Sequence, residues 1–150
     1  MEFVEIKNKE DCIKADGLLN ELISYESDFD DVINGNCVIK GFHEECINHS
    51  HVFAYYVKDK EECVGYIFAY LKNVENDVLN TNVIVLESLF VKEQYRRNKI
   101  GSKLIFMLEE WAKKNFSNYI VEITSLSKNK NAIKFYESLG YKQSKVIFRK

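Results

Sequence analysis

The residue types best suited to chemistry lie in one short turn, between an apolar run that ends at Val91 and a helical pattern that begins at Gly101. The turn carries two neighbouring arginines, Arg96 and Arg97. The first amides of a helix have no partner within the helix, and the helix dipole adds partial positive charge there. Such helix ends bind phosphate readily. The order of strand, basic turn, glycine and helix therefore predicts a pyrophosphate site and a ligand that carries a nucleotide.

Acidic side chains form a second group of candidates. Glu87 is the one charged residue within the apolar run VIVLESLFV. It is either a catalytic base or a strand residue whose carboxylate faces water. Glu26, Asp28 and Asp30 belong to an acidic stretch over residues 26–31, which is either a solvated loop or a surface for a cationic ligand.

A metal site is not expected. The three histidines lie close together in the sequence, at His43, His49 and His51, with Cys46 among them. Their spacing fits no common zinc pattern. The four cysteines form no C-x-x-C motif, and scattered thiols of this kind usually behave as small buried apolar groups in a reducing compartment.

The composition is that of a globular enzyme or binding protein. The chain has 150 residues, of which 46% are hydrophobic and 29% charged, enough for a single domain over residues 1–150 with its own core. The net charge of -2 gives no general attraction to nucleic acid or to an anionic membrane. No apolar run approaches the roughly 20 residues that span a bilayer. The acidic start, MEFVEIKNKEDC, does not resemble a signal peptide, so we expect a cytoplasmic protein.

The first half of the chain predicts the elements that precede the turn. Residues 3–7 alternate like a half-buried strand, and Asn8 is spaced to cap a first helix that ends near the acidic stretch. Residues 38–49 predict a second, short helix. Two aromatic runs, residues 51–58 and 63–71, predict a hairpin, in which Gly65 marks a bulge or a close backbone approach.

The second half predicts the elements around and after the turn. A polar turn over residues 73–81 leads into a strand over 83–91. An apolar stripe that includes Ile100, Leu104 and Trp111 predicts the helix after the basic turn. A strand over 119–124, a helix over 132–139 that ends at Gly140, and a closing strand over 141–148 complete a mixed α/β order.

Two segments resemble the GNAT superfamily of acyl-CoA-dependent N-acyltransferases. The basic turn, read from Arg96 to Gly101, is similar to the family's Q/R-x-x-G-x-G/A pattern. A second motif near the C-terminus keeps the family's spacing throughout, at Asn129, Ala132, Phe135, Tyr136, Gly140 and Tyr141. A strand that ends in TSLSK lies between them. The resemblance implies a mostly antiparallel central sheet of six to seven strands, flanked by about four helices and splayed at its centre.

The turn departs from the family pattern at one position. Lys99 stands where the first glycine is usual, and glycine permits both close approach and unusual φ angles. Because lysine keeps the amide donor, we expect the phosphate site to survive with altered detail.

The resemblance implies acetyl-CoA as the co-substrate. The amides of the turn would hold its pyrophosphate, and the strand that precedes the turn would pair with the pantetheine arm as an added strand does. The expected cofactor-binding residues are Leu89, Phe90, Val91, Arg96, Arg97, Asn98, Lys99, Ile100, Gly101, Ser102, Asn129, Ala132, Phe135 and Tyr136.

The implied reaction moves an acetyl group from sulfur to a primary amine by direct transfer. Glu87 is the candidate base and Tyr136 the candidate acid that protonates the leaving thiolate. Glu26, Asp28 and Asp30 favour a small cationic acceptor of polyamine or aminoglycoside type. A protein or peptide acceptor, and a non-catalytic acyl-CoA-binding module, remain as alternatives. A homodimer is left open.

Overall fold

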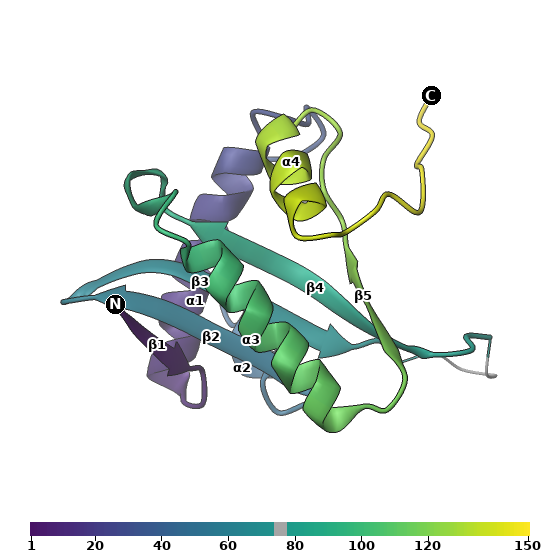
Figure 1. The fold of residues 1–150 in the computed structure, drawn as a ribbon. Coiled ribbons are helices and arrows are strands. Elements are labelled where there is room, and N and C mark those ends of the chain that lie inside the picture. Colours follow the sequence, from purple (N-terminus) through teal and green to yellow (C-terminus); the bar gives the residue numbers. More distant parts are fainter. Residues whose placement is uncertain (74–77) are drawn as a thin grey trace.

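The computed structural model describes residues 1–73 and 78–150 and contains one five-stranded sheet in the order β1-β2-β3-β4-β5 (Figure 1). The strands are β1 (Glu2–Glu5), β2 (Val52–Asp59), β3 (Glu62–Leu71), β4 (Asn82–Val91) and β5 (Tyr119–Ile123). The helices are α1 (Lys9–Glu26), α2 (Phe42–Cys46), α3 (Ile100–Asn115) and α4 (Lys130–Ser138), with a short 3-10 turn, η1 (Glu93–Tyr95), after β4.

The sheet is mixed, as expected. Strands β1 to β4 are antiparallel neighbours, and β5 is parallel to β4. The two aromatic runs form the hairpin of β2 and β3. A β-carbon on Gly65 would lie 2.8 Å from the carbonyl oxygen of Phe90, so the close backbone approach is confirmed. The ladder between β2 and β3 also shifts register after Val57, opposite Gly65.

The two faces of the sheet carry different helices. Figure 1 shows α3 crossing one face and α1 crossing the other, with α4 above the end of the sheet where β4 and β5 diverge. Leu104 and Leu108 of α3 are buried against that first face, and Ala15 and Leu18 of α1 against the second. The sheet therefore separates two apolar clusters. A reaction that uses side chains from both faces has to take place at an edge of the sheet or at an opening between two strands.

The predicted cap of the first helix is confirmed, and a second asparagine cap is found at α4. The side chain of Asn8 caps α1 by accepting a hydrogen bond from the amide of Asp11 at 2.9 Å. Asn129 caps α4 in the same way, through the amide of Ala132 at 3.2 Å. The helix expected over residues 38–49 is shorter, over Phe42–Cys46. The turn expected over residues 73–81 falls partly on residues 74–77, which lie outside the described residues.

The closing strand expected over residues 141–148 is wrong, and the sheet has five strands instead of six or seven. After Gly140, whose φ is 91°, the tail has neither helix nor strand. Val146, Ile147 and Phe148 are 75%, 76% and 91% exposed. A strand needs a neighbouring edge to satisfy its backbone, and alternation in the sequence does not supply one.

Candidate active site

The centre of the sheet opens beside Glu87. β4 pairs with β5 from Asn82 opposite Tyr119 to Leu86 opposite Ile123, and the ladder ends there. On the other side of β4, the register with β3 shifts between Phe68 and Ala69, so that Glu87 is an extra residue between Leu86 and Ser88. A bulge of this kind bends a strand and redirects side chains. The splayed centre is confirmed, and residues 87–91 form a β4 edge without β5 pairing.

The basic turn has the backbone of an anion site. Arg97 and Lys99 both adopt left-handed conformations, with φ of 65° and 60°. Lys99 therefore takes the conformation that glycine adopts most easily, at the position where the family pattern has glycine. Whereas α1 and α4 have asparagine caps, Lys99 precedes α3 without a side-chain cap, and the first turn of α3 has no acid. Among the long helices of the described residues, α3 is thus the one whose first amides have no side-chain cap. Free amides at a helix start suit an anionic ligand.

Arg96 has a different environment from Arg97. Its Nε donates a hydrogen bond to the carbonyl of Val91 at 2.8 Å, and its guanidinium lies 4.5 Å from the centre of the Tyr25 ring. The side chain thus ties the turn to the end of α1, a contact that the sequence analysis missed. Lys103 lies over the Phe3 ring at 4.1 Å. Arg97 and Lys99 are the exposed cations of the turn.

The C-terminal motif packs α4 beside the start of α3. A β-carbon on Gly101 would lie 3.2 Å from the ring of Phe135, so glycine there allows the two helices to approach. The side-chain oxygen of Asn129 is used by its cap, which leaves its amide group as the part that would donate to a ligand. The motif's residues are therefore brought next to the basic turn, although they lie about thirty positions away in the sequence.

Tyr136 is partly buried against the α3 side of the sheet. Burial raises its pKa to about 12, with a further contribution from the charge of Glu26 at the end of α1. The phenol is therefore protonated at neutral pH. Because α1 crosses the opposite face of the sheet, the charge of Glu26 acts on Tyr136 from the other side of the sheet.

Glu87 faces the α1 side of the sheet. The hydroxyl of Tyr70 donates to its carboxylate at 3.3 Å, and Tyr70 packs with Phe68 in the α1 cluster. Burial raises the pKa of Glu26, and the charge of Glu87 raises it further. The charge of Glu26 thus links α1 electrostatically to Glu87 of β4 and to Tyr136 of α4.

The other two predicted acceptor-binding acids, Asp28 and Asp30, lie in different surroundings. Asp28 lines a cavity of about 760 Å³ between the end of α1 and the β4–α3 connection. Glu21 and Asp31, which belong to the same acidic zone of the sequence, line this cavity as well. Glu93 lines it from the β4–α3 connection and was missed by the sequence analysis, because it lies about 60 positions further along the chain. Asp30 instead accepts two hydrogen bonds of 2.9 Å from Nη1 of Arg149 in the tail, and this contact lowers its pKa.

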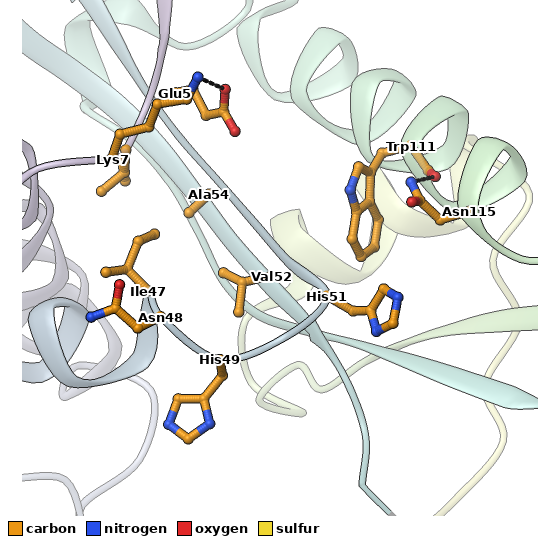
Figure 2. A pocket seen from close by; sticks show the side chains of 11 residues that line it. Glu5, Lys7, Ile47, Asn48, His49, His51, Val52, Ala54, Trp111 and Asn115 are labelled. Carbon is orange, nitrogen blue, oxygen red and sulfur yellow. Dashed lines mark hydrogen bonds and ion pairs between the residues drawn. The ribbon is translucent and has the colours of Figure 1, made fainter.

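A smaller cavity of about 360 Å³ lies away from these residues (Figure 2). His49, His51 and Asn48 line it from the segment before β2, and Trp111 and Asn115 from α3. The two histidine rings point in different directions in Figure 2. Among the described residues, no group of three His, Cys, Asp or Glu side chains is placed to hold a metal ion. None of the described helices is long and apolar enough to cross a membrane.

Solved structures share this fold at low sequence identity. The BH1408 protein of Bacillus halodurans, solved as a tetramutant, superposes with a TM-score of 0.83 at 17% identity, covering 99% of this chain and 98% of that one. Aminoglycoside 6'-N-acetyltransferase AAC(6')-Ig of Acinetobacter haemolyticus gives 0.70 at 16% identity, with 100% and 97% coverage. AAC(6')-Iy in complex with CoA gives 0.70 at 20% identity, with 99% and 98% coverage. No curated protein matches the sequence.

The family itself is shown by the sequence. The pattern of the Acetyltransferase (GNAT) family matches residues 19–141, a range that includes the end of α1, the bulged strand, the basic turn and the motif of α4. The donor in this family is acetyl-CoA, and the opened β4 edge and the uncapped start of α3 suit it. The chain therefore belongs to the GNAT acetyltransferase family.

Proposed function

We propose that the protein transfers an acetyl group from acetyl-CoA to a primary amine of a small cationic molecule, with both substrates bound together. The observation that carries this proposal is the end of the β4–β5 ladder beside Glu87, where Glu87 and Tyr136 are both electrostatically coupled to Glu26. Glu26 and Glu87 lie on the acceptor side, and Tyr136 lies on the side that carries the phosphate-binding turn. Direct transfer needs a base on one side of the thioester and an acid on the other.

Glu87 serves as the base. An amine with the pKa of a lysine, about 10.4, is neutral only about once in a thousand molecules at pH 7. The ammonium has to lose a proton before its nitrogen can attack. A carboxylate at the bulge, oriented by the hydroxyl of Tyr70, is placed to take that proton directly or through water.

Tyr136 serves as the acid for the departing sulfur. Bound acetyl-CoA supplies the thioester, whose sulfur leaves as a thiolate. With a pKa of about 12, the phenol carries its proton at neutral pH and can donate it as a hydrogen bond to the sulfur as negative charge develops there. The backbone amide of Leu89, on the opened edge of β4, is the donor we assign to the carbonyl oxygen as it gains negative charge.

Recognition of the acceptor rests on charge. Glu21, Asp28, Asp31 and Glu93 line the larger cavity. Two cations, Lys92 and Arg96, line it as well, and Lys92 pairs with Glu62 at 3.1 Å and with Glu21 at 3.8 Å, so the lining holds four carboxylates and two cations. Excess carboxylate in a cavity favours an acceptor with several ammonium groups. Several structural neighbours are aminoglycoside acetyltransferases, and they support the same class without identifying the molecule.

The test is a panel of amines with acetyl-CoA, read as free thiol released. We expect turnover with polyamines or aminoglycosides, and at least a 10²-fold loss in kcat for Glu87→Gln. Turnover confined to peptides would favour the protein N-acetyltransferase alternative. Binding of acetyl-CoA without thiol release from any amine would favour a non-catalytic module.

We also propose a reducing, cytoplasmic setting and a homodimer. All four cysteines are free thiols, as expected where disulfides do not persist. The apolar side chains of Val146, Ile147 and Phe148 in the tail would be covered by a second copy. Light scattering of the intact chain and of a variant with all three changed to serine tests this: a monomer in both excludes the dimer.

A further inference from the structure

The helix that carries Tyr136 is packed lightly against the rest of the molecule. Every residue of α4 stays at least partly exposed, whereas α3 has five buried residues. The ring of Phe135 lies against Gly101 at the start of α3, and a single contact of this kind would leave α4 free to tilt. A displacement of about 1 Å at a reacting group can lower a rate by 10²-fold. An acid on α4 therefore needs a second contact that fixes the direction of the helix.

The end of α4 joins Tyr136 rigidly to Tyr141. Gly140 has a φ of 91°, and its amide donates to the carbonyl of Glu137 at 3.0 Å. The amide of Tyr141 donates to the carbonyl of Tyr136 at 3.1 Å. This pair of bonds is the Schellman arrangement that ends many helices. The two tyrosine rings also pack against each other, with centres 6.4 Å apart at an interplanar angle of 71°. Where the side chain of Tyr141 is held, Tyr136 is held with it.

The side chain of Tyr141 is held by α3. Its hydroxyl donates a hydrogen bond of 2.7 Å to Oε1 of Glu109, and a bond to a charged acceptor is about twice as strong as one between neutral groups. Burial raises the pKa of Tyr141, and the bond to Glu109 raises it further, so the phenol stays protonated and remains a donor. Because Glu109 uses this proton, Tyr141 is not itself placed to protonate a leaving group.

The two contacts of α4 lie apart along α3. Gly101 and Glu109 are separated by eight residues, which is about 12 Å along a helix. One contact fixes the position of α4 at a point, and two contacts that far apart also fix its direction. Tyr136 lies between them in the sequence, one residue after Phe135 and five before Tyr141. A phenylalanine at position 141 would keep the ring and lose the contact that sets this direction.

We propose that Tyr141 and Glu109 are a positioning pair for the acid Tyr136. Their hydrogen bond holds α4 in the direction that brings the Tyr136 hydroxyl to the sulfur of bound acetyl-CoA. Neither residue touches a substrate, and no proton moves between them. The inference rests on the proposed acetyl transfer, in which Tyr136 is the acid. Breaking the bond should therefore lower kcat without lowering the affinity for either substrate.

The test breaks the bond from each side in the full-length protein. Tyr141→Phe and Glu109→Ala should each lower kcat for amine acetylation about tenfold, with KM for acetyl-CoA and for the amine within about twofold of wild type. Glu109→Gln keeps an acceptor oxygen and should restore kcat to within about threefold of wild type. Tyr95→Phe, which removes a tyrosine–glutamate bond of 2.9 Å to Glu62, is the matched control and should leave kcat unchanged.

A second background separates positioning from stability. In Tyr136→Phe, the further change Tyr141→Phe should leave kcat as it is, because the group that the bond positions is already gone. A bond that only stabilises the fold would lower Tm in both backgrounds and leave kcat unchanged. A wild-type kcat in Tyr141→Phe, or an equal fold-loss in both backgrounds, overturns the proposal.

A measurement without turnover separates this inference from the proposed function. In NMR spectra with isotope-labelled tyrosine, we expect the ring resonances of Tyr136 to shift and broaden in Tyr141→Phe and to keep their wild-type positions in Tyr95→Phe. Unchanged Tyr136 resonances in Tyr141→Phe overturn the positioning pair, whether or not an amine is acetylated. Changed resonances in a protein that acetylates no amine mean that the pair holds Tyr136 and that the proposed function is wrong. If Tyr141→Phe does not fold, Glu109→Ala and Glu109→Gln are compared by the same two measurements.

Discussion

Tyr136 carries the clearest expectation for a single residue. Tyr136→Phe removes the proton donor and keeps the ring that packs beside Phe135. We expect kcat to fall by roughly 10²-fold and the affinity for acetyl-CoA to stay nearly unchanged. Because the pKa is raised to about 12, ionisation of Tyr136 should add no loss of rate on the alkaline side below pH 11. Steady-state kinetics across pH measure both effects, and an unchanged kcat removes Tyr136 from the mechanism.

Lys99 combines an unusual backbone with a useful charge. A left-handed conformation costs an L-residue about 1–2 kcal/mol, and glycine relieves that cost. We expect Lys99→Gly to be about 1 kcal/mol more stable to denaturant than Lys99→Ala. Both variants lose the ammonium group and should raise KM for acetyl-CoA by about three- to tenfold. If Lys99→Ala binds acetyl-CoA as the wild type does, the lysine does not contact a phosphate.

At the scale of elements, the end of α1 lies next to the basic turn. Tyr25 lies under Arg96 of the phosphate-binding turn, and the next residue, Glu26, acts on Tyr136. A helix that contacts the turn at one residue and acts by its charge on Tyr136 at the next would couple the two proposed binding events through a rigid backbone. The sequence shows neither contact, because the residues involved are about 70 to 110 positions apart.

Arg96→Lys tests this coupling. Lysine keeps the charge but cannot reproduce both the bond from Nε to Val91 and the stacking on Tyr25. We expect a loss of about 1–2 kcal/mol in the free energy of unfolding, and a higher KM for both the amine and acetyl-CoA. Arg97→Lys is the matched control and should alter only the KM for acetyl-CoA. An effect of Arg96→Lys on acetyl-CoA alone would mean that the turn and α1 are independent.

At the scale of the whole molecule, the C-terminal tail contacts the loop after α1, where we propose that the acceptor binds. The chain ends with Arg149 bound through two hydrogen bonds to Asp30, a carboxylate expected to attract the substrate. A guanidinium already on Asp30 competes with a cationic acceptor for the same charge. The ion pair joins residues 119 positions apart. The sequence does not show it, because residues 141–148 were predicted as a strand of the sheet and form a tail instead.

Arg149→Ala should therefore improve acceptor binding. We expect KM for a cationic amine to fall by about threefold, with a smaller difference at high salt, since exposed charges are screened. Lys145→Ala, which removes a looser tail contact with Glu122 at 3.6 Å, is the control and should leave KM unchanged. A rise in KM for Arg149→Ala would mean that the tail helps to build the acceptor site.

The sequence by itself determined the signals that act over a few residues. The cap at Asn8, the hairpin, and the basic turn before α3 follow from local hydrogen bonding and periodicity, and these were predicted at the right residues. Glu87 and Tyr136 were also selected, because an acid inside an apolar strand and a tyrosine within a spaced motif stand out from their neighbours.

Only the tertiary structure decided what meets across the sheet. It placed the bulge at Glu87, tied Arg96 to α1, buried His43 on Asp16 and left the tail outside the sheet. Such contacts depend on strand register and on which helix crosses which face. Both are set by the packing of the whole core, so no stretch of sequence contains them.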